Sequence, residues 1–529
     1  MDVASESRVV FVDAETGAEQ TTTRREHETV LDALIRVGTN AAFSCRRGTC
    51  QVCVLRAVDG DPGPAARVGL SDEAQALGWF LPCKAQPEGP LVVTKPDLDA
   101  LTIPAHVIDK TWRSDSVVQL RLLPESTLSW RAGQFVTLTH PSGAQRSYSI
   151  ASTMAEDDAL ELHVRRVAGG LVSGWLGDEV EVGAVLPMRG PSGACFYDPD
   201  SRERPLLLVA GGTGLAPLLG IVRDALAHDH RGPIQLVHGS TRIDGLYADD
   251  TLAELATAHP NLSVETWLDD PSEPLPPGCG RGSVVDAAFA RGLVPSGAIL
   301  YLAGPPAMVY EARYRAVLAG VARADIHADP FEDARPTMPD DKAKLARIQP
   351  DPELWAALES GPGLTRILTD FYAHAFADPR LAPFFHNVSR QRAIEKQYEF
   401  LSDVFTGSGH YFGARPFNAH HWMVISDELF DYREAQIDAA IRRYGLAEHL
   451  HRRWSAIHEL FRREIVKTHR RGLIMDGVEQ RDAIEERTRD EVLELDSICD
   501  ACFVEVRAGT TVRHQLLTGR VVCLACASG

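Results

Sequence analysis

The chain has 529 residues, 44% hydrophobic and 24% charged, an ordinary globular composition that predicts roughly three to five domains. Its formal net charge of −19 argues against nucleic acid and anionic membranes as partners, because both would repel it. The start of the sequence lacks a signal pattern, and the uncharged run over 205–222 is interrupted by four glycines and two prolines. We therefore expect no membrane span. Eight of the ten cysteines have metal-ligand spacing, which favours a reducing, cytoplasmic location over disulfides.

A cysteine cluster follows a predicted strand over 8–12 and an amphipathic helix over 28–37. Four and then two residues separate Cys45, Cys50 and Cys53, and Cys83 follows after a gap of 29 residues. Three thiolates in one loop with a distant fourth are typical of a 2Fe-2S cluster, whereas zinc would favour two paired knuckles. Residues 1–97 resemble a plant-type ferredoxin, which implies a β-grasp fold.

Two short polar stretches predict a flavin site. A tyrosine ring can stack on an isoalloxazine with a serine hydroxyl near its reactive nitrogen, and an arginine can grip a pyrophosphate. A glycine pair lets backbone N–H groups approach a phosphate. A hairpin strand with a glycine turn is the structural alternative. The residues are Arg146, Tyr148 and Ser149, followed by Gly169, Gly170 and Ser173.

An apolar strand over 206–210 runs into a glycine turn and a helical pattern, the layout that brings nucleotide phosphates to a helix N-terminus. The turn consists of Gly211, Gly212, Thr213 and Gly214, and Gly304 and Pro305 follow a later strand. This order resembles the ferredoxin–NADP reductase superfamily. The resemblance implies an antiparallel β-barrel for FAD over 98–200 and an α/β domain for NAD(P)H over 201–333.

The same resemblance assigns two further positions. Ala303 stands where the family usually has a cysteine beneath the nicotinamide, and Phe331 is a candidate to shield the flavin, with an ordinary core role as the alternative. Ser240 and Arg242 could bind a 2′-phosphate, but Arg242 can equally pair with Asp244, so NADH is favoured over NADPH. His238 is expected to be a core residue at the end of a strand. With the ferredoxin segment in front, the chain resembles the reductases of ring-hydroxylating dioxygenases.

A change in composition marks the second half of the chain. Residues 334–349 are rich in proline, aspartate and lysine and are predicted to be a linker. Residues 350–472 show only helical patterns. The expected helices cover 354–359, 364–377, 390–405, 434–444 and 450–469.

Histidines and aromatic residues give this helical domain a chemical signature. An imidazole can take one axial position of a haem iron, while a phenol and an amide can donate hydrogen bonds to bound dioxygen. The pattern resembles a truncated haemoglobin of the first group, which implies haem b. By that likeness His420 is the proximal ligand, with His421 as the rival, and Tyr372 and Gln397 are the distal catalytic pair. Tyr372 could instead be a core residue. The small Ala393 leaves room for gas entry.

The tail combines a charged segment with a second cysteine set. Residues 473–496 are charge-dense and are predicted to form an exposed helical linker. Two cysteine pairs separated by 20 residues predict a zinc ribbon over 497–529, with rubredoxin-type iron as the alternative. The ribbon is a candidate docking surface for a protein partner. Its ligands are Cys499, Cys502, Cys523 and Cys526.

The predicted fold class is therefore multidomain: β-grasp ferredoxin, antiparallel β-barrel, α/β nucleotide domain, all-α truncated globin and zinc ribbon. Electrons from NAD(P)H would pass through FAD and the 2Fe-2S cluster to haem, and the tether would raise the effective concentration of donor and acceptor. The leading hypothesis is nitric oxide dioxygenation, with dioxygen and nitric oxide as substrates, by analogy of architecture. The alternatives are a reductase component that serves a separate oxygenase and a haem-based gas or redox sensor.

Overall fold

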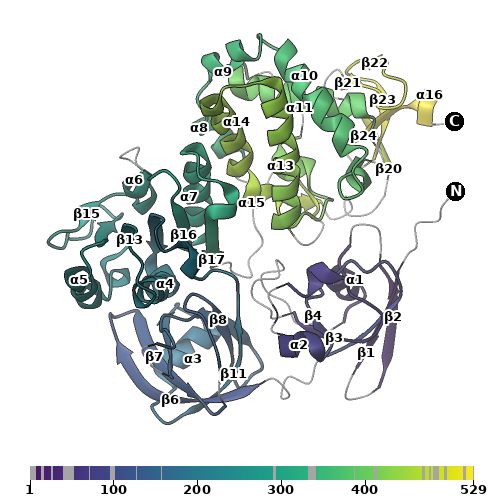
Figure 1. Ribbon diagram of the computed structural model, residues 1–529. Helices are drawn as coiled ribbons and strands as arrows, with labels where there is room; N and C mark the ends of the chain where they lie inside the picture. Colours follow the sequence, from purple (N-terminus) through teal and green to yellow (C-terminus); the bar gives the residue numbers. More distant parts are fainter. Residues whose placement is uncertain are drawn as a thin grey trace. The chain divides into compact units, whose positions relative to one another are not determined.

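The computed structural model forms two compact units, Met1–Ala334 and Arg335–Gly529, which are described separately (Figure 1). Among the described residues, none of the helices combines the length and apolar character that a membrane crossing requires. The described residues are 7–13, 17–24, 28–39, 53–68, 70, 72–95, 102–126, 128–155, 158–289, 294–331, 341–385, 388–409, 411, 414–467, 471–475, 478–480, 488–493, 497–515 and 520–527.

The first domain is a five-stranded sheet with a helix on it, as the ferredoxin resemblance implies. The sheet has the order β2-β1-β5-β3-β4, and β1 pairs with β5 in parallel. Helix α1 begins at a capping box, in which Thr29 and Asp32 satisfy each other's backbone N–H groups. The elements are β1 (Arg8–Val12), β2 (Glu19–Thr23), α1 (Val30–Arg36), β3 (Leu55–Asp59), α2 (Asp72–Ala76), β4 (Trp79–Phe80) and β5 (Leu91–Thr94).

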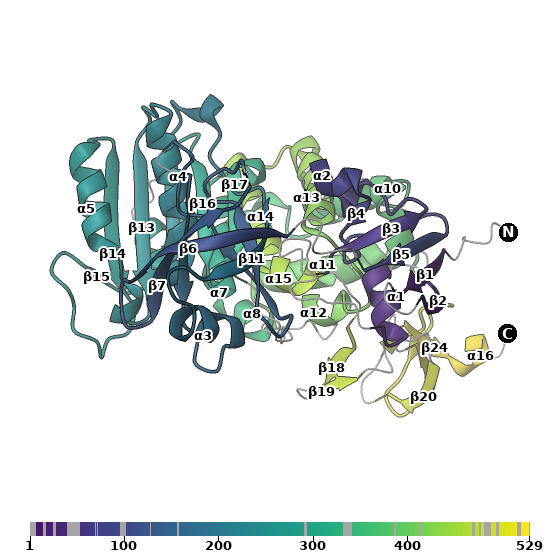
Figure 2. The same ribbon diagram turned by 90° about the horizontal axis from the view of Figure 1, so that it is seen from below.

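The second domain is an antiparallel barrel, seen from below in Figure 2. Its strand order is β10-β7-β6-β11-β8-β9, and a bridge between Ile150 and Leu162 joins the two outer strands. Alternate apolar residues fill the interior, as expected for a small barrel. The elements are β6 (Ile103–Trp112), β7 (Val117–Pro124), β8 (Phe135–Thr139), β9 (Gln145–Ser149), β10 (Leu160–Arg165), α3 (Leu171–Asp178) and β11 (Val185–Ser192).

The third domain has a six-stranded parallel sheet of order β15-β14-β13-β12-β16-β17, with helices packed along it. Every residue of β12 is buried, as expected for a central strand covered on both faces. The elements are β12 (Leu206–Gly211), α4 (Leu215–Ala227), β13 (Ile234–Ser240), α5 (Asp249–Ala258), β14 (Leu262–Leu268), β15 (Gly280–Arg281), α6 (Val284–Phe289), β16 (Ile299–Gly304), α7 (Pro306–Leu318) and β17 (Ile326–Pro330).

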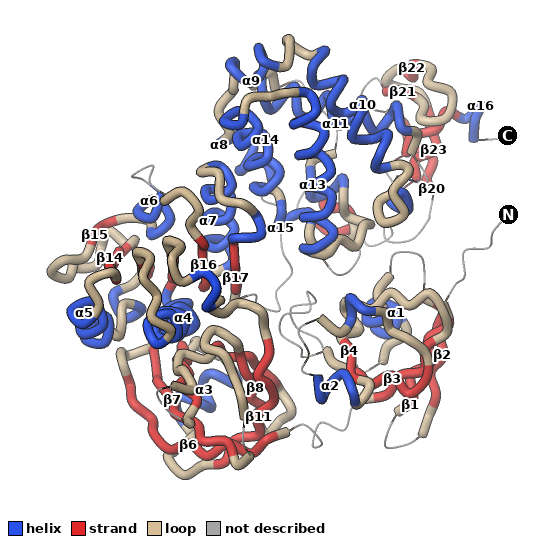
Figure 3. Tube along the Cα trace, in the orientation of Figure 1, coloured by secondary structure: helices blue, strands red, loops and turns tan. Residues whose placement is uncertain are grey.

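The fourth domain is helical (Figure 3), as its sequence pattern predicts. The helix predicted over 450–469 ends early, because the chain becomes extended where Lys467 bridges to Ile425. The elements are α8 (Asp341–Arg347), α9 (Pro352–Ala357), α10 (Pro362–Ala375), α11 (Arg390–Thr406), α12 (Pro416–Ala419), α13 (Asp427–Tyr444), α14 (Glu448–Leu460) and α15 (Arg462–Ile465).

Part of the linker predicted over 334–349 is helical, because residues 341–347 form α8. Lys344 donates to both carboxylate oxygens of buried Glu464 at 2.7 Å, so this part of the segment packs against α15. A lysine that is paired with a buried carboxylate belongs to the globin domain rather than to a solvated connection.

The charged helix predicted over 473–496 is wrong for the part of this segment that the structure describes. Residues 473–475, 478–480 and 488–492 form short strands, and β20 pairs with β23 next to the cysteine cluster. Its charges are matched across strands, as Arg513 with Asp490 at 2.8 Å, instead of along a helix. The elements are β18 (Leu473–Met475), β19 (Val478–Gln480), β20 (Thr488–Val492), β21 (Ser497–Ile498), β22 (Glu505–Val506), β23 (Thr511–Gln515), β24 (Arg520–Cys523) and α16 (Leu524–Ala527).

Candidate functional site

The predicted flavin residues lie together on the barrel. Strand β9 carries Arg146, which is exposed, and Tyr148, which is half-buried. Burial raises the pKa of the Tyr148 hydroxyl, and the positive charge of Arg146 only partly offsets this rise. A half-buried phenol ring beside a guanidinium suits a flat, phosphorylated cofactor such as FAD.

The glycine pair opens helix α3. Gly169 has a φ of +72°, and Gly170 is the N-cap, without a side-chain cap for the first N–H groups. Ser173 accepts a hydrogen bond from the Val167 N–H at 3.2 Å, which fixes the loop in front of the helix. The uncapped N–H groups and the helix dipole are suited to a phosphate.

The nucleotide turn is shaped by the neighbouring strand β16. A Cβ on Gly214 would lie 2.1 Å from the carbonyl oxygen of Ala303, and one on Gly211 would lie 2.7 Å from Cδ of Pro305. Gly304, with a φ of +134°, completes this close approach. The structure therefore brings the two predicted nucleotide motifs to the carboxyl edge of β12 and β16, where parallel sheets bind nucleotides.

Neighbouring side chains complete the nucleotide edge. Nε2 of buried His238 lies 3.1 Å from the carbonyl oxygen of Gly212, the residue before Thr213 in the turn. Burial lowers the pKa of His238 to about 4. The interpretation of His238 as a core residue at a strand end agrees with this position. Arg242 lies 3.7 Å from Asp244 and 3.3 Å from Glu273, so both carboxylates compete with a 2′-phosphate for it.

An aspartate that the sequence did not single out joins the flavin and nucleotide domains. Ser149, at the end of β9, donates to Oδ2 of Asp329 in β17 at 3.0 Å. Burial raises the pKa of Asp329 to about 6, although the hydrogen bond from Ser149 opposes the shift. Phe331, two residues further on, is exposed at this end of the strand and donates its N–H to Gly304 at 2.9 Å. The serine–aspartate pair can hold or pass a proton near neutral pH.

The ferredoxin cysteines are only partly within the described residues. Cys53 and Cys83 are buried in one apolar cluster with Leu31 and Trp79. Cys45 and Cys50 lie outside the described residues. The N–H of Leu31 donates to Pro82 at 3.0 Å, so α1 fixes the segment that carries Cys83. Two buried thiols in apolar surroundings fit a cluster shielded from water.

The helical domain brings the predicted distal residues together. The hydroxyl of Tyr372 on α10 donates to Oε1 of Gln397 on α11 at 2.6 Å. Burial raises the pKa of Tyr372 to about 12, so the phenol remains a proton donor at neutral pH. Phe385 contacts the Tyr372 ring edge-on and stacks on Phe376 with 4.7 Å between ring centroids. A polar pair enclosed by aromatic rings fits the distal wall of a haem pocket.

His420 has the chemistry of an axial ligand. Its Nδ1 lies 2.8 Å from the carbonyl oxygen of Pro416, one helical turn earlier, and burial followed by the charge of Lys467 lowers its pKa to about 4. The imidazole is therefore neutral, and donation from Nδ1 leaves the Nε2 lone pair for a metal. His421 is only 2% exposed and is enclosed by protein, whereas His420 is half-buried, which favours His420.

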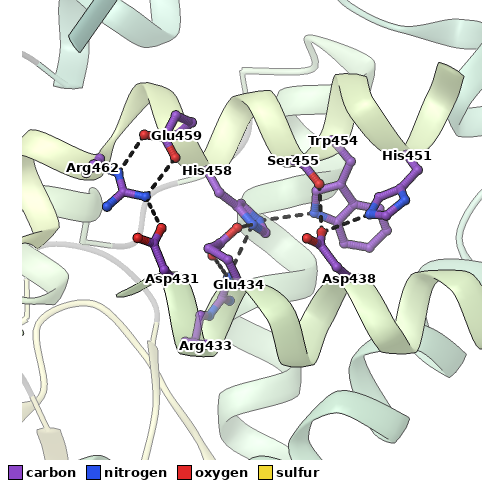
Figure 4. Close-up of polar contacts among 10 residues, drawn as sticks. All are labelled: Asp431, Arg433, Glu434, Asp438, His451, Trp454, Ser455, His458, Glu459 and Arg462. Atoms are coloured by element: carbon purple, nitrogen blue, oxygen red, sulfur yellow. Dashed lines mark hydrogen bonds and ion pairs between the residues drawn. The ribbon is translucent and has the colours of Figure 1, made fainter. Parts of the chain in front are cut away.

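A buried polar network lies between α13 and α14 (Figure 4). Trp454 donates from Nε1 to Nε2 of His458 at 3.1 Å, and Nδ1 of His458 lies 3.0 Å from Oε2 of Glu434. Because an indole nitrogen can only donate, His458 is protonated on Nδ1 and passes that hydrogen bond to Glu434. A second cluster places Arg462 between Glu459 and Asp431.

The C-terminal cysteines form a compact thiol set. The sulfur atoms of Cys499, Cys502, Cys523 and Cys526 all lie within 4.8 Å of one another. Burial opposes ionisation of Cys499, but backbone N–H groups outweigh it and lower its pKa to about 6. The other sulfurs hold the pKa of Cys526 near 12, since neighbouring thiols share its proton. A dication would relieve this competition, so the set fits a tetrahedral metal.

Four family models match the chain. They are a 2Fe-2S iron-sulfur cluster binding domain over 13–88, an oxidoreductase FAD-binding domain over 104–197, an oxidoreductase NAD-binding domain over 208–313 and a bacterial-like globin over 354–466. The molecule is thus an iron–sulfur flavoprotein oxidoreductase joined to a globin.

Known relatives match the reductase part. The reductase subunit of an aromatic O-demethylase from Amycolatopsis sp. is 38% identical over 296 residues, 53% of this chain and 87% of that protein. The ferredoxin–NAD(P)+ reductase component of a naphthalene 1,2-dioxygenase system from Pseudomonas putida is 30% identical, covering 57% of this chain and 93% of that protein. The crystal structure of the Amycolatopsis cytochrome P450 reductase GcoB has 32% identity and a TM-score of 0.45, and covers 62% of this chain and 100% of that chain. The chain belongs to the family of NAD(P)H-dependent, ferredoxin-type flavoprotein reductases.

Proposed function

We propose that the protein is a nitric oxide dioxygenase in which the reductase part re-reduces the globin of the same chain. The observation that carries this proposal is the hydrogen-bonded Tyr372–Gln397 pair in a globin fused to a family reductase. A globin that only stores oxygen has little need for a dedicated reductase, whereas one oxidised at every turnover does.

The electron balance suits a hydride donor. Two nitric oxide and two dioxygen molecules with one NAD(P)H give two nitrates, NAD(P)+ and a proton, so one hydride supports two turnovers. FAD and the 2Fe-2S cluster would divide the electron pair, and haem b would supply the iron that carries dioxygen. Engagement of Arg242 by two carboxylates favours NADH as the donor.

The residues of the chain would act by position and polarity. The Tyr148 ring would lie against the flavin, and the pair Ser149–Asp329 would hold a proton beside it. Gln397 would turn its amide NH2 toward the Tyr372 oxygen when dioxygen is bound, which leaves the single hydroxyl hydrogen of Tyr372 to donate to the oxygen ligand. His420 would hold the haem iron through its neutral imidazole.

The test is NADH-dependent nitrate formation from nitric oxide in aerated buffer by the purified full chain. Nitrate should form at two equivalents per NADH, and nitric oxide consumption that is independent of NADH would contradict the proposal. A Cys50→Ser variant tests the route through the cluster, with Cys279→Ser as the matched control because Cys279 belongs to neither metal-ligand set. Loss of haem reduction with normal flavin reduction supports that route. Unchanged haem reduction would assign direct donation from flavin.

A second candidate function follows from the relatives, which are named as reductases of separate oxygenases. In that case the cluster would serve an external acceptor and the globin would be accessory. The full chain would then reduce cytochrome c quickly but consume nitric oxide no faster with NADH than without it. The C-terminal set of four cysteines would bind zinc in either case, and a protein partner could dock there.

A further inference from the structure

Helix α13 carries a cation, Arg433, next to the helix of the predicted distal residue Tyr372, and neither the sequence pattern nor the proposed reaction uses it. The guanidinium of Arg433 lies 4.9 Å from the centroid of the Phe371 ring, next to Tyr372. The Phe371 ring in turn contacts the Tyr372 ring edge-on, with 4.9 Å between the two centroids. One aromatic ring therefore separates the Arg433 guanidinium from the predicted distal residue Tyr372.

The buried network of Glu434, His458 and Trp454 fixes the position of the Arg433 guanidinium. Nη1 of Arg433 donates to Oε1 of Glu434 at 2.5 Å, while Oε2 of the same carboxylate accepts from His458 (Figure 4). Glu434 is fully buried, whereas the Arg433 side chain is 25% exposed. Trp454 fixes the far side of His458. The carboxylate thus lies in the protein interior, and the guanidinium is the accessible member of the pair.

Part of the guanidinium remains available for a ligand. An arginine carries five N–H donors in a planar fork and stays protonated in proteins. Nη1 of Arg433 donates to Glu434, and in the described part of the chain Nε and Nη2 make no hydrogen bond. A fork of this kind in a partly dehydrated site pairs well with a small anion, especially an oxyanion that can accept two hydrogen bonds.

We propose that Arg433 makes the globin pocket a binding site for small monovalent anions such as nitrite, nitrate and azide. Glu434 and His458 act as positioning residues that hold the cation toward the pocket. The proposal requires that the globin bind haem, but it does not require nitric oxide dioxygenation. If that reaction does take place, nitrate formed in the pocket would meet this cation before it leaves.

The experiment measures ligand affinity in the ferric, haem-loaded full chain by titration of the Soret band. Azide and nitrite are the anionic probes, and carbon monoxide on the ferrous protein is the neutral probe. Arg433→Ala should weaken azide and nitrite binding by about ten- to a hundredfold, as expected for loss of a charge-assisted hydrogen bond. Carbon monoxide affinity should stay within about twofold, because a neutral ligand gains little from the charge.

Two further variants separate charge from folding. Arg433→Gln removes the charge while still donating to Glu434, and should weaken anion binding as the alanine variant does. Arg433→Lys should restore most of the affinity. Arg443→Ala is the matched control, because Arg443 lies on the same helix but pairs with Asp370 at 2.6 Å and is 51% exposed. Its anion affinities should match those of the parent.

The carboxylate groups of the haem are the alternative anionic partner for Arg433. The rate of haem transfer to apomyoglobin distinguishes a free anion from the haem carboxylates as the partner of Arg433. If Arg433 pairs with a haem carboxylate, Arg433→Ala should release haem faster. Unchanged anion affinity in Arg433→Ala, with or without faster haem release, overturns the proposal. An equal loss of anion and carbon monoxide affinity also overturns it, because that would indicate a general collapse of the pocket.

Discussion

Asp329→Asn should make the reductase part more stable in alkaline conditions. Burial raises the pKa of Asp329 from 3.8 to about 6, so the folded protein favours the neutral carboxyl. The stabilising contribution of the proton is complete below the unfolded pKa and is lost as pH rises through about 6. A difference of about two pKa units corresponds to about 3 kcal/mol at about pH 8. Asparagine stays neutral and can still accept the hydrogen bond from Ser149.

Urea unfolding followed by flavin fluorescence reports on this part of the chain at each pH. The gain in free energy of unfolding should grow from near zero at about pH 4 to about 2–3 kcal/mol at about pH 8. Asp325→Asn is the control, because it removes a partner of Arg204 at 2.9 Å and should bring no gain. A gain that is the same at both ends of the pH range, or absent at the upper end, would refute the reasoning.

Three other changes have distinct expected outcomes. Tyr372→Phe removes the hydroxyl that donates to Gln397 at 2.6 Å, so dioxygen should leave the ferrous protein about tenfold faster in stopped-flow measurements. Gly214→Ala would place a Cβ 2.1 Å from the Ala303 oxygen, and flavin reduction by NADH should slow about tenfold or more while FAD content is kept. Cys526→Ser should lower bound zinc from about one atom per chain to near none by elemental analysis, with haem content unchanged. Normal rates in the first two variants, or full zinc in the third, would contradict the assignments.

The sequence was most informative where a motif is local. The glycine turn over 211–214 and the helical periodicity of the globin depend on residues close together in the chain, and the described elements agree with them. The choice of His420 over His421 follows from the family spacing and stays a prediction.

The residues that sequence reasoning missed depend on distant pairing. Asp329 meets Ser149 across 180 residues, and it does so only because β17 pairs with β16 at Ala303. Arg433 lies in a charged helix where an arginine ordinarily indicates a solvated face. Its role depends on Glu434 being buried, which no periodicity predicts.

The error over 473–496 has a similar origin. Dense charge is compatible with an exposed helix or with paired edge strands, and composition does not distinguish the two. The partner strand β23 lies on the far side of the cysteine loop, so the pairing of Thr488 with Gln515 could not be foreseen locally.

The Ala303 carbonyl that defines the nucleotide turn has an evolutionary consequence. The atom that excludes a side chain at position 214 belongs to the main chain, so mutation of residue 303 itself leaves it in place. Selection for glycine at position 214 therefore acts through the backbone of its neighbour, and a substitution at 303, whose own side chain is fully buried, cannot relieve it.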